Sequence, residues 1–98
     1  MDTRSVDCRK VADLEFVKEP GDFFIYGEDE KGAAWMVLCL PGEEKIDGAG
    51  GIQIFRHEIL SHPGWHWDGN LDKPTLTPSI HHVGVWHGYM RAGRLESC

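Results

Sequence analysis

Glycine and proline interrupt this chain so often that long helices have no room to form. Its 98 residues include twelve glycines and five prolines, and both residue types favour turns over helix interiors. The runs between them are short and rich in aromatic and β-branched residues, which is typical of strands. The sequence therefore predicts one mostly β domain over residues 1–98, either a small antiparallel sheet or a sandwich-like arrangement, with at most one short helix.

The clearest strand patterns lie in two predicted hairpins and one segment between them. Residues 22–27 (DFFIYG) and 33–40 (AAWMVLCL) flank EDEKG, which predicts a hairpin turn. Residues 50–57 (GGIQIFRH) alternate in the way of a strand with two different faces. Residues 83–97 predict a second hairpin with Gly93 at its turn. The edges of such a sheet need cover, which favours a homo-oligomer.

Only one segment carries a helical pattern. Residues 5–17 (SVDCRKVADLEFV) place Val11 and Leu14 three positions apart, as on one face of a helix. Phe16 and Val17 then follow side by side, so the period is not settled. We expect at most one short helix here.

The segment GWHWDGNLDKPTLTPSIHH (residues 64–82) is unusually rich in rigid, aromatic and polar residues. Pro74 and Pro78 fix their own φ angles and push the preceding residues toward extended geometry, and DGN is a turn signal. We therefore expect a stiff turn segment. Trp65 and Trp67 would share a face in extended chain, where they either close the core or offer a stacking surface.

Charge and hydropathy exclude several classes of protein. The net charge is −6, and residues 1–50 hold twelve acidic against six basic residues, whereas residues 51–98 hold four of each and all six histidines. Long nucleic acid needs a basic face, which this chain lacks. No apolar run approaches the ~20 residues of a membrane span, and the N-terminus lacks the apolar core of a signal peptide. We expect a cytosolic protein that binds neither membranes nor long nucleic acid.

The pattern W-x-W-x-G-N…PTLTPSI, followed by WHGYMRAGRLESC, resembles a family of short tailed-phage and prophage proteins. Some of these carry the label ammonia monooxygenase, an activity that no residue here supports. The resemblance covers about residues 34–98. The family has a CxCG-like and a Cys-His-Ser element, which here read CLPG, with Cys39 alone, and WHG, with Trp86 in place of the cysteine and His87 retained. If that pattern binds zinc in the family, the site is degraded or rebuilt in this chain.

A zinc site is one candidate for the chemistry of this chain. Its three cysteines form no CxxC pair, and an odd number in a reducing compartment argues against a disulfide framework. Zinc requires three or four tetrahedral ligands, for which the candidates are Cys39, His87 and Cys98, with His57 or His81 as a fourth. The alternative is that Cys39 is a buried strand residue and His87 lies on a hairpin face.

Binding of a small anionic ligand, such as a nucleotide derivative, agrees better with the residue types. Aromatic rings that could stack on a base are Trp65, Trp67, Trp86 and Tyr89. Cationic side chains that could hold phosphate are Lys73, Arg91 and Arg94. Hydroxyl donors are Thr75, Thr77 and Ser79. The resemblance to phage proteins implies that such a ligand is a host defence signal. Alternatively, Arg91 and Arg94 only flank a solvated turn.

Two other functions remain open, a zinc-stabilised protein-interaction module and, less favoured, a metal-dependent hydrolase. A hydrolytic site could combine a Thr or Ser hydroxyl with Asp68 and one of the later histidines, His81, His82 or His87. Because neighbouring strand residues face opposite ways, His81 and His82 could not both serve it. No nucleophile elbow or HExxH helix is present. We therefore expect a binding protein rather than an enzyme.

Overall fold

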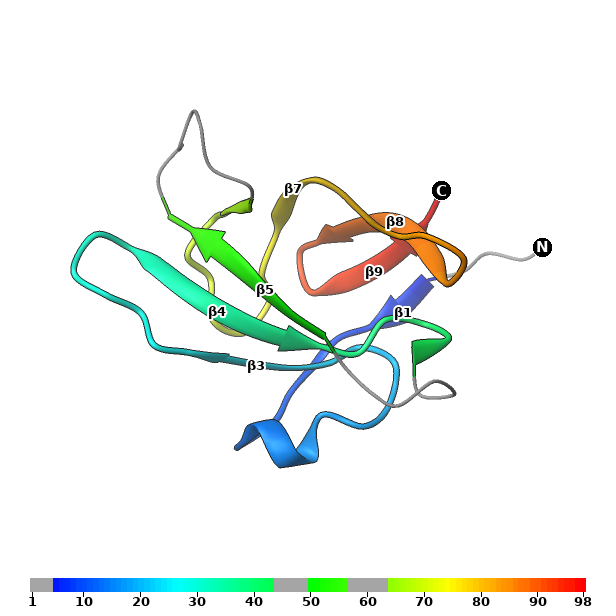
Figure 1. Cartoon of the computed structure of the whole chain (residues 1–98), viewed down its shortest axis with the longest axis horizontal. Helices are drawn as coiled ribbons and strands as arrows, with labels where there is room; N and C mark the ends of the chain where they lie inside the picture. Colours follow the sequence, from blue (N-terminus) through cyan, green and yellow to red (C-terminus); the bar gives the residue numbers. More distant parts are fainter. Residues whose placement is uncertain (1–4, 44–49, 57–63) are drawn as a thin grey trace.

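The computed structural model describes residues 5–43, 50–56 and 64–98, and in these ranges β strands joined by turns and loops are the main regular structure (Figure 1). A 3-10 turn, η1, spans Leu14–Phe16. The nine strands are β1 (Ser5–Asp7), β2 (Arg9–Lys10), β3 (Asp22–Tyr26), β4 (Ala33–Leu38), β5 (Gly50–Phe55), β6 (Trp65–Trp67), β7 (Leu76–His82), β8 (Trp86–Arg91) and β9 (Arg94–Ser97). The predicted mostly β fold is confirmed. In the described ranges no helix is long and apolar enough to cross a membrane.

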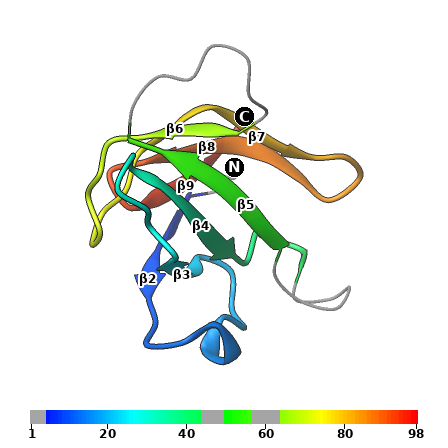
Figure 2. The same ribbon diagram turned by 60° about the vertical axis from the view of Figure 1, so that its left-hand side comes forward.

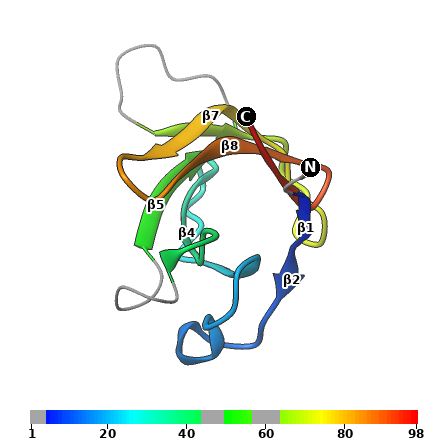
Figure 3. The ribbon, with the colours of Figure 1, turned by 90° about the vertical axis from the view of Figure 1, so that its right-hand side faces the viewer.

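All nine strands belong to one sheet, which curves until it nearly closes into a barrel (Figure 3). The strand order is β1-β9-β8-β7-β6-β5-β4-β3-β2, with parallel pairing only in β2–β3 and β5–β6. The two outermost strands follow each other directly, because only Cys8 separates β1 from β2. The Cys8 N–H donates to Gly93 O at 2.8 Å and the Arg9 N–H donates to Gly21 O at 2.9 Å. The N-terminal segment therefore joins the two ends of the sheet.

The interior of the barrel holds the apolar side chains of alternating strand residues, as period-two patterning requires. Figure 2 shows the strands of β4 to β8 wrapping around this interior. The fully or nearly buried core residues are Phe23, Ala34, Met36, Leu38, Leu40, Ile54, Trp67, Leu76, Ile80, Met90 and Leu95. Trp35 and Tyr26 occupy the alternate positions of β4 and β3 and remain exposed.

Both predicted hairpins are present. β3 and β4 pair antiparallel with Tyr26 opposite Trp35. β8 and β9 pair antiparallel with Arg91 opposite Arg94. The turn between β8 and β9 needs a left-handed residue, which Gly93 supplies with φ of +76°.

The expectation of at most one short helix within residues 5–17 is confirmed, because the segment holds one 3-10 turn and no longer helix. Residues 5–10 are extended in β1 and β2, and only Leu14–Phe16 form a helical turn. The reason is tertiary. The edges of β9 and β3 offer hydrogen bonds to this segment, and the Arg9 guanidinium forms two 3.1 Å contacts with the carboxylate of Asp22. These contacts outweigh a weak local helical pattern.

The expectation that both prolines of PTLTPS serve a turn is wrong for Pro78, because β7 begins at Leu76, whereas Pro74 lies in the loop before it. Pairing of β7 with β8 shifts register between Leu76 and Ile80. Pro78 lies within this irregular stretch, where a residue without an N–H causes the least loss of ladder hydrogen bonds. The turn chemistry ends earlier, in the loop before β7, where Asn70 Oδ1 accepts from the N–H groups of Asp72 and Lys73 at 2.9 and 2.8 Å.

Candidate functional site

A serine and a histidine lie together on the outer face of the β7–β8 hairpin. Ser79 Oγ is 3.2 Å from His87 Nε2. The register places His81 directly opposite His87, and Ser79 shares their face because it precedes His81 by two strand residues. Ser79 therefore meets His87 as a diagonal cross-strand neighbour. The two strands lie next to each other in Figure 2.

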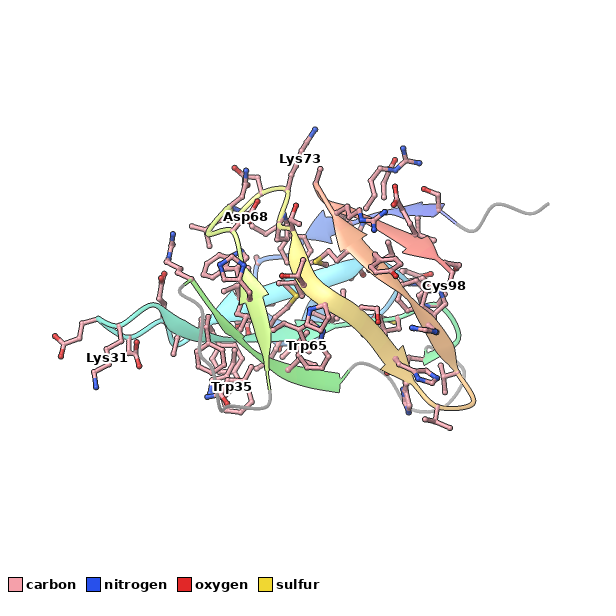
Figure 4. All side chains as sticks on the ribbon, turned by 90° about the horizontal axis from the view of Figure 1, so that it is seen from above. Lys31, Trp35, Trp65, Asp68, Lys73 and Cys98 are labelled. Atoms are coloured by element: carbon pink, nitrogen blue, oxygen red, sulfur yellow. The ribbon has the colours of Figure 1, made fainter. Side chains whose placement is uncertain are left out.

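This contact has the geometry of a nucleophile and its general base. When the His87 proton is on Nδ1, Nε2 can accept the hydroxyl proton of Ser79, and 3.2 Å is within hydrogen-bond reach. The Trp65 Nε1–H donates to Ser79 O at 3.2 Å and so anchors the backbone of the serine (Figure 4). The ring of His81 stacks on that of His87, with 4.5 Å between centroids and 28° between planes.

The aromatic residues predicted to stack on a ligand are not gathered into one platform. Trp67 is fully buried in the core, where its Nε1–H donates to Asn70 O at 3.0 Å. Trp65 and Trp86 pack partly against the core, and the Trp86 Nε1–H donates to Ser97 Oγ at 2.7 Å. The ring of Tyr89 lies under the Arg91 guanidinium, 4.2 Å from its Cζ.

The predicted cationic side chains are also separated. Lys73 projects from the loop before β7 (Figure 4) and lines a cavity of about 320 Å³ with Asp7, Cys8, Asp72, Ala92, Gly93 and Arg94. Arg94 pairs with Asp7 at 3.2 Å on β1, whereas Arg91 pairs with Glu96 at 3.3 Å on β9.

Of the predicted hydroxyl donors, only Ser79 contacts a titratable side chain. Thr75 Oγ1 accepts from the Ala92 N–H at 2.8 Å and so braces the β8–β9 turn. Thr77 is exposed on the outer face of β7. Asp68, considered as a catalytic carboxylate, instead accepts from the N–H groups of Asn70 and Thr75 at 3.0 and 3.2 Å.

The predicted zinc ligands come together only in part. The β8–β9 register brings Cys98 beside His87, and the Cys98 N–H donates to His87 O at 3.0 Å. Cys39 is buried in the core. Over residues 5–43, 50–56 and 64–98, no three His, Cys, Asp or Glu side chains form a group that could hold a metal ion. His57 lies outside the described residues, and the zinc site stays a prediction.

A second histidine contact, this one with a carboxylate, lies on the other face of the sheet. Glu43, with its side chain 6% exposed, contacts His82 Nδ1 at 2.8 Å through Oε2 and accepts from the Leu40 N–H at 2.8 Å through Oε1. His82 neighbours His81 in β7 and so faces the opposite way. The pair therefore joins the segment after β4 to the β7–β8 hairpin rather than completing the Ser79–His87 contact.

The sequence placed Ser79 among ligand-binding residues and His87 among zinc ligands, and it joined a serine with His87 only in the less favoured hydrolase hypothesis, without identifying Ser79 as the partner. The missing information was the register of β7 with β8, because a spacing of eight residues says nothing by itself about contact. A detectable signal was the pattern Ser-x-His in 79–81 followed by another histidine after a short turn. If residues 79–82 were recognised as a strand, hairpin pairing would place the side chains of Ser79, His81 and His87 on one face.

Comparison with known proteins identifies a family over nearly the whole chain. The family model BubE, described as bacterial ubiquitination-like system serine protease, matches residues 10–98. Among curated proteins no match was found. Among solved structures none was found either.

This match corrects three expectations drawn from the sequence. The assignment to a phage and prophage family is wrong, because the BubE model accounts for residues 10–98. Capture of a small anionic ligand and the alternatives of a zinc module or a metal-dependent hydrolase are also wrong as descriptions of function, since the family is one of serine proteases. The expectation that the chain is a binding protein rather than an enzyme is wrong for the same reason. By this match, the chain belongs to the BubE family.

Proposed function

We propose that this protein is a serine protease of a bacterial ubiquitination-like system, with Ser79 as nucleophile and His87 as general base. The observation that carries the proposal is the 3.2 Å contact between Ser79 Oγ and His87 Nε2, in a chain whose family is described as serine proteases. The side chains come from adjacent strands of one hairpin, so rigid backbone holds both.

The reaction follows the general course of acyl transfer by serine. Ser79 Oγ attacks the carbonyl carbon of the scissile bond while His87 Nε2 takes the hydroxyl proton. The resulting imidazolium then donates this proton to the leaving amine, and an acyl-enzyme remains on Ser79. Water, deprotonated by the same nitrogen, hydrolyses the ester and restores the serine. The outer-face position of the pair suits a protein substrate, because an extended chain can reach it without entering the barrel.

The family description supports a protein substrate from the ubiquitination-like system, and we propose the ubiquitin-like protein of that system or its conjugates. The compartment proposed is the bacterial cytosol. No disulfide joins Cys8, Cys39 and Cys98, which is compatible with a reducing environment.

The test is covalent labelling with a fluorophosphonate probe, which reports an activated serine without knowledge of the substrate. Ser79 Oγ would displace fluoride from phosphorus, with its proton passing to His87. We expect one probe per chain, located on Ser79 by peptide mass spectrometry. Ser79→Ala should abolish labelling, and His87→Ala should slow it by at least about 10²-fold.

Thr77→Ala provides the matched control, because Thr77 lies on the same face of β7 and is exposed. Its labelling rate should equal that of the unsubstituted protein. If labelling persists in Ser79→Ala, or if the probe attaches to another serine, the assignment of the nucleophile is wrong. A folded chain that never reacts would contradict the proposed activity itself.

A further inference from the structure

The His87 imidazole has an unusual environment for a catalytic base. In serine protease triads, a carboxylate bound to the second imidazole nitrogen fixes the ring and stabilises its protonated form. Among the described residues no side chain bonds to His87 Nδ1. The ring is instead covered on one face by His81, at a centroid distance of 4.5 Å.

The stack follows from the register of the hairpin and not from a flexible encounter. His81 and His87 are directly opposite each other in β7 and β8, the arrangement in which side chains of one face approach most closely. Two residues before His81, the same face carries Ser79. One rigid strand thus supplies both the hydroxyl that His87 contacts and the ring that covers it.

The other polar groups near His87 on β8 and β9 make contacts of their own. On β9, Glu96 is opposite Tyr89 and its carboxylate contacts Arg91 of β8 at 3.3 Å. Cys98, beside His87 on the same side of the hairpin, brings a thiol. Among the described side chains of β7 and β9, the His81 ring is therefore the one that contacts the His87 ring directly.

We propose that His81 is a positioning residue of this pair, an inference that rests on the proposed protease function. Its ring holds the His87 imidazole in the plane that reaches Ser79. The contact is one of ring face against ring face, so another aromatic side chain at position 81 could make it as well.

Two substitutions test the ring contact. His81→Ala removes the ring, and we expect fluorophosphonate labelling to be roughly 10- to 100-fold slower, as for a misplaced catalytic group. His81→Phe keeps an aromatic face at the same position. It should restore labelling to nearly the unsubstituted rate, because the ring face is what holds His87.

The control is His66→Ala, which removes a histidine from β6 whose ring contacts only Arg56 O, at 3.2 Å, among the described groups. Its labelling rate should not change. If His81→Ala labels as fast as His66→Ala, or if His81→Phe labels no faster than His81→Ala, the positioning role is overturned.

These outcomes are distinguishable from failure of the proposed function. Loss of labelling in Ser79→Ala together with an unchanged rate in His81→Ala would support the protease assignment and overturn only the role of His81. Persistent labelling in Ser79→Ala would contradict the assignment of the nucleophile itself. Should His81→Ala fail to fold, as judged by its circular dichroism spectrum, His81→Thr takes its place, because a β-branched residue without a ring suits an exposed strand position.

Discussion

At the scale of single residues, Asp22 does the most to hold the N-terminal segment in place. Its side chain is 3% exposed and contacts Arg9 through both oxygens. It also accepts from the N–H groups of Lys18 and Glu19 at 3.2 and 2.9 Å. Burial alone would raise the pKa of Asp22, but these hydrogen bonds together with the Arg9 charge lower it. The carboxylate is thus stabilised in its ionised form.

Asp22→Asn should destabilise the protein by about 3 kcal/mol at neutral pH, because it leaves Arg9 and buried N–H groups without their anionic partner. A lowered pKa in the folded state means that the stabilisation is present above the unfolded value, about 3.9, and is lost as pH falls toward the folded value. Urea unfolding should therefore show a large difference between the two proteins near pH 7 and a smaller one near pH 3.

Asp72→Asn is the control for this experiment. Asp72 pairs with Lys10 at 2.9 Å, but its side chain is 78% exposed, and exposed pairs contribute little. We expect its unfolding curve to match that of the unsubstituted protein. Equal effects of the two substitutions would contradict the role given to Asp22.

At the scale of elements, β8 carries the base of the candidate site and depends on one glycine. A Cβ at Gly88 would overlap Glu96 O and the indole ring of Trp86. Trp86 is thereby able to fold over Gly88 and bond to Ser97 on β9. The absence of a side chain at position 88 lets β8 pack closely against β9 while Trp86 covers it.

Gly88→Ala should cost about 1–3 kcal/mol, since neither a backbone carbonyl nor a packed indole can move away cheaply. The comparison is Gly51→Ala in β5, where a Cβ would meet nothing within 4 Å. Thermal unfolding should show a clearly lower melting temperature for Gly88→Ala than for the unsubstituted protein. The melting temperature of Gly51→Ala should be close to that of the unsubstituted protein. If both variants melt alike, the steric account of β8 fails.

At the scale of the whole molecule, the barrel closes through a seam at Cys8. This residue sits between β1 and β2, and its N–H bonds to the β8–β9 turn at Gly93. Burial, helped by the nearby Asp7 charge, raises the pKa of the Cys8 thiol to about 12. Near pH 8 very little thiolate therefore forms at the seam while the barrel is closed.

Thiol reactivity measures this closure. With an aromatic disulfide reagent near pH 8, the native protein should show one fast-reacting thiol, the exposed Cys98, and Cys98→Ser should remove that phase. The buried Cys39 and the Cys8 thiol should react only as fast as the molecule opens, and all three should react at once in denaturant. Fast reaction of Cys8 in the native protein would show that the seam is open.

Much of the fold could be predicted from residue patterns. The alternation in residues 22–27, 33–40 and 50–57 identifies β3, β4 and β5, and Gly93 identifies the last turn, because these signals are local. The helical pattern in residues 5–17 did not predict β1 and β2, because the extended form of these strands depends on Asp22 and on the edges of distant strands. The start of β7 was not predicted from residues 74–79, because proline is typical of turns. In the structure, Pro78 is accommodated in a strand by irregular pairing with β8.

The sequence by itself determined that this chain forms many short strands, with turns where glycine and proline require them, since backbone preferences act within a few residues. It also supplied Ser79, His81 and His87 as candidates. Only the tertiary structure decided that these three share one face, that Trp67 is core, and that the N-terminal strands close the sheet. Those outcomes depend on register and closure, and both are determined by burial and pairing between residues far apart in the chain.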